Sequence, residues 1–183
     1  MKKRVLTYGL IAGLIVSLIM VGSMPFMENI DGMWGMVIGY TSQIIAFAFI
    51  FVAVKTYREK EGNGIITFGK AFQIGLYISL IASTMYVVSW MIEYHYFLPD
   101  FMEKFTAMTL EKMKADGASA AEIAETTKQF AEYGEIYKSP IKLFLFTYVE
   151  ILPTGLLASL LAALILKKTP GAAELAQANH NNP

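Results

Sequence analysis

The stretch PDFMEKFTAMTLEKMKADGASAAEIAETTKQFAEYGEIYKS, residues 99–139, decides the fold because it is a long polar segment set between apolar runs. It holds eight of the 15 acidic residues in the chain. Pro99 and Asp100 suit the start of a helix, since proline fixes φ and lacks the N–H that would be unpaired there. Phe101 and Phe105 then begin an apolar stripe at helical spacing. We therefore expect an amphipathic helix directly after Pro99.

A second helix is expected between residues 120 and 137. Gly117 suits the end of the first helix, where a left-handed residue commonly follows the last turn. Ser119 stands three residues before Glu122, the spacing of a capping box that pairs two backbone donors at a helix start. Residues 99–139 are thus predicted to form an amphipathic helical hairpin.

The remaining chain has the composition of a membrane protein. Hydrophobic residues make up 55% of the chain, charged residues make up 16%, and mean hydropathy is +0.47. About 20 apolar residues suffice to cross a bilayer as a helix. The sequence predicts an all-α polytopic membrane domain over residues 1–168 and a disordered polar tail over 169–183. Its four predicted transmembrane helices span about 5–22, 33–54, 71–97 and 141–166.

The first apolar run has a competing interpretation as a signal peptide, because three basic residues precede it. Gly9 and Gly13 favour a retained span, since a four-residue spacing of small residues lets helices approach closely in lipid. All four spans carry such a pair, which predicts a tightly packed bundle. The residues expected at these helix-packing faces are Gly9, Gly13, Gly35, Gly39, Gly75, Ser79, Gly155 and Ser159.

Orientation follows from the basic residues near the ends of the spans. The short loop 25–31 contains two acids and no base. By the positive-inside rule, both termini are expected in the cytoplasm and the hairpin 99–139 in the periplasm, across a bacterial inner membrane. The nine bases on the cytoplasmic side are Lys2, Lys3, Arg4, Lys55, Arg58, Lys60, Lys70, Lys167 and Lys168.

Several kinds of function are excluded or disfavoured by what the sequence lacks. No cysteine is present, which excludes disulfides and thiolate metal sites. A formal net charge of zero gives no nucleic-acid footprint. There is also no phosphate-binding loop, HExxH or GxSxG motif. We expect no catalytic residue, cofactor or dedicated metal site.

Glu150 is the strongest candidate for a functional polar residue, since charged groups inside a span are costly. Pro153 follows three residues later and leaves the carbonyl of Val149 without its helical donor. With Glu93 and His95 at the end of span three, Glu150 could form a cluster that binds a cation or relays protons. The alternative is that a neighbouring hydroxyl satisfies Glu150 while Glu93 and His95 are solvated at the interface.

Four short stretches occur in a fixed order along the chain: Ile66–Phe72 (ITFGKAF), Gly117–Ala124, Tyr137–Pro140 and Leu156–Lys168. In this order they resemble the DUF4199 family of uncharacterised bacterial membrane proteins. The resemblance covers about residues 1–169 and implies a four-helix integral membrane protein, with no activity or cofactor attached.

Two functions from different classes are expected from these features. The first is a non-enzymatic accessory or interaction module of the inner membrane, in contact with lipid, with a protein partner at the external hairpin and homo-oligomerisation allowed. The second is a small proton- or cation-coupled carrier that uses Glu150. A membrane enzyme acting on lipid or envelope precursors would need a nucleophile or metal site that the sequence does not offer.

Overall fold

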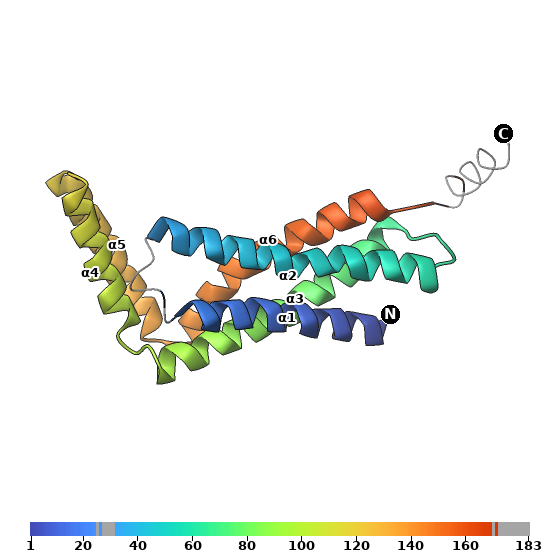
Figure 1. Ribbon diagram of the computed structural model, residues 1–183, viewed down its shortest axis with the longest axis horizontal. Coiled ribbons are helices and arrows are strands. Elements are labelled where there is room, and N and C mark those ends of the chain that lie inside the picture. The colour runs from blue at the N-terminus through green and yellow to red at the C-terminus, as the bar shows by residue number, and fades with distance from the viewer. Residues whose placement is uncertain (25, 27–31, 170, 172–183) are drawn as a thin grey trace.

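Six helices make up nearly all of the described chain (Figure 1). The computed structural model describes residues 1–24, 26, 32–169 and 171. The helices are α1 (Lys2–Ser23), α2 (Gly32–Lys60), α3 (Phe68–Tyr96), α4 (Phe101–Ala115), α5 (Ala120–Tyr137) and α6 (Pro140–Leu166). No strand occurs in these residues, and Ile66 and Lys168 form an isolated antiparallel bridge. The all-α prediction is confirmed, while the loop 25–31 and the tail 169–183 lie largely outside the described residues.

Four helices are long and apolar enough to cross a membrane: α1, α2 from Trp34, α3 and α6. The 29 residues of α3 extend about 43 Å at 1.5 Å per residue, against a hydrocarbon core of about 30 Å. The helix is therefore longer than the hydrocarbon core is thick. The expectation of four spans is confirmed by length and composition.

The end of α2 differs from its predicted span, which stops at residue 54. The helix continues to Lys60, with Arg58 and Lys60 in its last turn. Hydropathy marks where the bilayer ends, and a helix can go on past that point into water. Positive side chains also stabilise a helix C-terminus through the helix dipole.

The described segments gather at two opposite ends of the bundle (Figure 1). The N-terminus, the α2–α3 connector and the end of α6 lie together, while α4 and α5 lie at the other end. Hydrogen bonds between the α2–α3 connector region and the end of α6, which are distant in sequence, join the segments at the first of these ends. Arg58 donates to the carbonyl of Leu166 at 3.2 Å, and the Ile66–Lys168 bridge has N···O distances of 3.0 and 2.9 Å. We call this region, which gathers all nine bases identified above, the basic end.

The core consists mainly of small and β-branched side chains, with the larger Phe47, Trp90 and Leu143 also buried, and many leucines face outward. Ala12, Ile78 and Ile151 are fully buried. Leu18 on α1 and Ile165 on α6 are 66% and 67% exposed. All four long helices carry apolar surface on the outside of the bundle. This surface is compatible with contact with a lipid bilayer, as expected of a membrane protein.

The boundaries expected within 99–139 agree with α4 and α5. Gly117 adopts the left-handed region at φ +79°, as predicted for the residue after α4. Ser119 and Glu122 form the predicted capping box at the start of α5. The two helices lie side by side, with the rings of Phe105 and Phe130 5.7 Å apart (Figure 1).

Candidate functional site

Glu93 is a buried carboxylate near the end of α3. Glu93 is only 7% exposed, and its Oε2 atom has no hydrogen-bond partner among the described residues. Its backbone carbonyl accepts hydrogen bonds from the N–H groups of Phe97 and Leu98, where α3 ends. A buried polar atom without a partner carries a desolvation penalty, which a bound proton or a nearby cation would reduce.

Glu150 lies on α6 and keeps exposed surface in the single chain. Pro153, inside the same helix, follows it three residues later. The Glu150 carboxylate is close enough to interact electrostatically with the hydroxyls of Tyr86 on α3 and Tyr137 on α5. Tyr86 also interacts with Glu93. The structure therefore brings both predicted glutamates near one tyrosine.

Tyr137 connects this group to the polar helices. It is the last residue of α5, outside the four long apolar helices. Burial raises the pKa of its hydroxyl, and the negative charge of Glu150 raises the pKa further. A tyrosine hydroxyl is already neutral at physiological pH, and both effects favour this protonated form, which can donate a hydrogen bond.

His95 does not join the two glutamates. Its side chain is exposed, and its ring contacts that of Tyr96 edge to face at 4.8 Å. Residues two apart on a helix point in different directions, which separates His95 from Glu93. Nowhere in the described ranges do three His, Asp or Glu side chains converge as a metal site would need. The exposed position of His95 agrees with the alternative in which this residue is solvated, and a role for Glu93 and Glu150 stays a prediction.

A continuous chain of aromatic contacts joins α3, α4, α5 and α6 at this end. Phe101 of α4 meets Trp90 of α3 edge to face at 5.0 Å and stacks on Tyr137 at 6.1 Å. Tyr133 of α5 meets Phe146 of α6 at 5.5 Å. Such ring pairs stabilise by about 0.5–1.5 kcal/mol each beyond their buried area. We call the set the aromatic chain; its members are Trp90, Tyr94, Phe101, Phe105, Phe130, Tyr133, Tyr137 and Phe146.

Four of the predicted helix-packing residues meet where α3 crosses α6. A Cβ added to Gly75 would lie 2.7 Å from the Cβ of Ser159, and one added to Gly155 would lie 2.7 Å from Oγ of Ser79. The two serine hydroxyls are 3.1 Å apart and bond back to the carbonyls of Gly75 and Gly155. Each glycine thus receives the serine of the opposite helix.

The other two glycine pairs have different surroundings. Gly9 and Gly13 of α1 are buried against Ile81 and Met85 of α3, which is the close contact a retained span needs. Gly35 and Gly39 of α2 are exposed, and nothing lies within 4 Å of a Cβ built on either. In the described chain this second pair has no helix packed on it.

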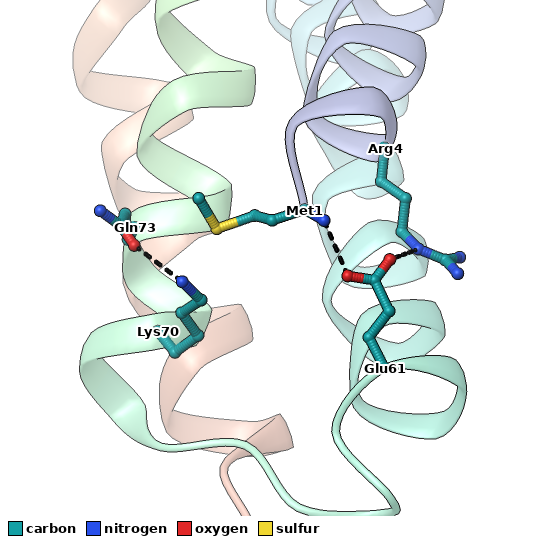
Figure 2. A network of polar contacts seen from close by, with 5 residues as sticks. All are labelled: Met1, Arg4, Glu61, Lys70 and Gln73. Atoms are coloured by element: carbon teal, nitrogen blue, oxygen red, sulfur yellow. Dashed lines mark hydrogen bonds and ion pairs between the residues drawn. The ribbon is translucent and has the colours of Figure 1, made fainter.

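At the basic end, Glu61 ties α1 to the α2–α3 connector (Figure 2). Its carboxylate accepts from the Met1 amine at 2.7 Å and from Nε of Arg4. These hydrogen bonds lower the pKa of Glu61 below its ordinary value. Lys70 donates to Gln73 nearby at 3.4 Å (Figure 2).

Sequence reasoning did not identify Tyr86 and Tyr137 as neighbours of the glutamates. One signal was available on α3, because Tyr86, Trp90 and Glu93 follow the three- and four-residue spacing of a single helix face. Tyr137 could not be found this way, since it comes from a different helix.

The chemistry open to this group is proton exchange or weak cation binding. Carboxylates accept protons and cations, and neutral phenols donate hydrogen bonds to carboxylates.

Comparison with known proteins identifies a family and no individual relative. The family model described as "Protein of unknown function (DUF4199)" matches residues 7–168. No curated protein and no solved structure matches the chain.

Proposed function

The chain belongs to the DUF4199 family of proteins of unknown function, and we propose that it is a non-enzymatic interaction module of the bacterial inner membrane. Its α4 and α5 helices form a hairpin that a protein partner contacts outside the bilayer. Glu111 and Glu125 are exposed residues of this pair.

The observation that carries this proposal is that α4 and α5 have clear local start and stop contacts yet contain no buried residue. The capping box and Gly117 define the turn between the helices, and the aromatic chain holds their base against the bundle. The two helices, of 15 and 18 residues, bury no residue of their own in the bundle. Presentation of a surface to another protein would account for a solvated helix pair that the aromatic chain attaches to the bundle.

The orientation proposed for the hairpin is periplasmic, with both termini in the cytoplasm. Support comes from the nine bases of the basic end, since short basic segments favour the cytoplasmic side. The α4–α5 pair lies at the opposite end of the bundle (Figure 1).

Site-specific photo-crosslinking in intact cells tests the interaction. A photoreactive residue at Glu111 or Glu125 is expected to give discrete adducts with another protein, because both side chains project into solvent. A matched probe at Ile165, 67% exposed on α6, is expected to contact lipid and give none. Equal adducts at all three positions, or none on α4 and α5, would count against an interaction surface.

A second candidate function, a small proton- or cation-coupled carrier, is favoured by the nearness of Glu93 and Glu150 to Tyr86. Glu150→Gln removes the charge with little change in shape. A carrier that uses Glu150 should then lose ion flux in proteoliposomes, while Glu125→Gln on the exposed face of α5 should retain it. Normal flux in Glu150→Gln would eliminate this candidate.

A further inference from the structure

The basic end contains an open pocket of about 350 Å³ between the first turns of α1 and the start of the α2–α3 connector. Its lining residues are Lys3, Arg4, Thr7, Tyr8 and Glu61. Because α1 crosses the membrane and begins here, the pocket lies where lipid headgroups meet the protein.

The pocket presents donors of the kind that bind a phosphate group. Arg4 uses Nε to pair with Glu61, and its two terminal nitrogens point away from that carboxylate (Figure 2). A guanidinium held in this way offers two parallel N–H groups to an anion. Lys3 is exposed and forms no ion pair within the described residues, and Thr7 and Tyr8 add hydroxyl donors.

The local charge balance favours an anion despite the presence of Glu61. The Met1 amine and Arg4 already bind both oxygens of that carboxylate. The segments that form the basic end, residues 2–4, 55–70 and 167–168, carry nine bases and two acids, Glu59 and Glu61. An anion in the pocket is therefore attracted by most of the surrounding charge.

A row of exposed apolar side chains on α1 extends from the pocket toward the centre of the membrane. Leu10, Leu14 and Leu18 are 41%, 51% and 66% exposed and continue the face of Lys3 and Thr7 at three- and four-residue steps. Thr7 and Leu14 are about 10 Å apart along the helix, within the depth of one leaflet, about 15 Å. One molecule with a charged head and apolar chains would contact both features.

We propose that this pocket binds the phosphate of an anionic glycerophospholipid, whose acyl chains lie along Leu10 and Leu14. Lys3 and Arg4 contact the phosphate, and Glu61 positions Arg4. The site would retain one lipid of the basic-end leaflet on the protein.

Lipid titration of the full chain in neutral detergent, followed by native mass spectrometry, tests this site. Phosphatidylglycerol is expected to bind in preference to phosphatidylcholine. Lys3→Gln should raise the apparent Kd for phosphatidylglycerol about fivefold, the effect of one basic contact at a membrane surface. Lys2→Gln is the matched control, since it removes the same charge from an exposed neighbour that does not line the pocket, and should change the Kd less than twofold.

Three results would overturn the proposal. Equal weakening by Lys2→Gln and Lys3→Gln would mean a diffuse surface potential without a site. Equal binding of the two lipids would remove the role of the anionic head. Competition by millimolar inorganic phosphate with the wild-type protein would indicate a small-anion site that does not need the acyl chains. Unchanged thermal unfolding of both variants establishes that a loss of binding is not a loss of fold.

Discussion

At Gly75 the replacement of one hydrogen by a methyl group tests how closely α3 and α6 pack. In Gly75→Ala the new Cβ would meet the Cβ and Cα of Ser159 at 2.7 and 2.9 Å, and the Cα belongs to backbone that cannot rotate away. We expect the variant to be destabilised by about 1–3 kcal/mol, the usual cost of overpacking. Unfolding of the purified protein in detergent measures the change.

Gly39→Ala is the matched control on α2, because nothing lies within 4 Å of a Cβ at that position. Its stability should stay within about 0.5 kcal/mol of the wild type. A loss comparable to that of Gly75→Ala would show that α2 packs on another copy of the chain.

The capping box predicts a pH dependence at the start of α5. Ser119 donates through its backbone N–H to Glu122 at 2.7 Å, and this hydrogen bond is the main cause that lowers the pKa of Glu122 from 4.5. A carboxylate with a lowered pKa stabilises the folded state above its unfolded pKa, and the effect is lost as pH falls through the folded pKa. Amide exchange in the first turn of α5, normalised for intrinsic rates, should therefore accelerate below about pH 4.5.

Glu122→Gln separates this effect from general acid unfolding. Glutamine can still accept the hydrogen bond but does not titrate in this range. The variant should lack the acid-induced acceleration in α5, and the same acceleration in Glu122→Gln would contradict the assignment.

The spacing of small residues predicts which helix faces allow another helix to pack closely. It does not predict which helix packs there. Gly75 and Gly35 have the same kind of partner four residues on, yet only Gly75 receives a side chain from another helix. His95 shows the converse, because its two-residue spacing from Glu93 on one helix is enough to predict that the two side chains point in different directions. Neighbours across helices depend on how the helices dock, which no local pattern encodes.

Among the elements, the aromatic chain determines how α4 and α5 are held. Phe101 contacts rings of three helices: Trp90 on α3, Phe105 on α4 and Tyr137 on α5. Phe101→Ala should free the base of α4 and leave the four long helices intact. We expect limited proteolysis between α3 and α4 to accelerate at least about fivefold, equivalent to about 1 kcal/mol, the size of one such ring pair.

Met108→Ala is the control for this variant, since Met108 is 43% exposed on the same helix and forms no part of the aromatic chain. Its cleavage rate should match that of the wild type. Equal acceleration in both variants would indicate general fraying of α4.

The helices themselves were largely predictable because each carries its own local determinants. Ser119 with Glu122, and Gly117 before them, set the boundary between α4 and α5 through contacts within one turn. The extension of α2 to Lys60 was missed, since its last residues are charged and hydropathy ends earlier. The aromatic chain was also missed, because its rings come from four separate helices.

For the whole molecule, one topology is proposed: both termini lie in the cytoplasm, and α4 and α5 lie in the periplasm. It rests on four helices of membrane-spanning length and on the basic segments that lie at the end of the bundle opposite α4 and α5. Composition was sufficient to predict the number of spans, and the charge pattern was sufficient to predict which segments lie together. The orientation in the cell is the central claim on which the proposed partner surface depends.

Cysteine accessibility in intact cells tests that claim most directly, because the chain has no native cysteine to give background labelling. Ala121→Cys places one thiol on exposed α5, and Thr169→Cys places one at the exposed end beyond α6. With a membrane-impermeant reagent, Ala121→Cys should be labelled before lysis and Thr169→Cys only after the membrane is opened. Labelling of Thr169→Cys alone in intact cells would reverse the orientation, and labelling of both would contradict a chain that crosses the membrane four times with α4 and α5 on the opposite side from its ends.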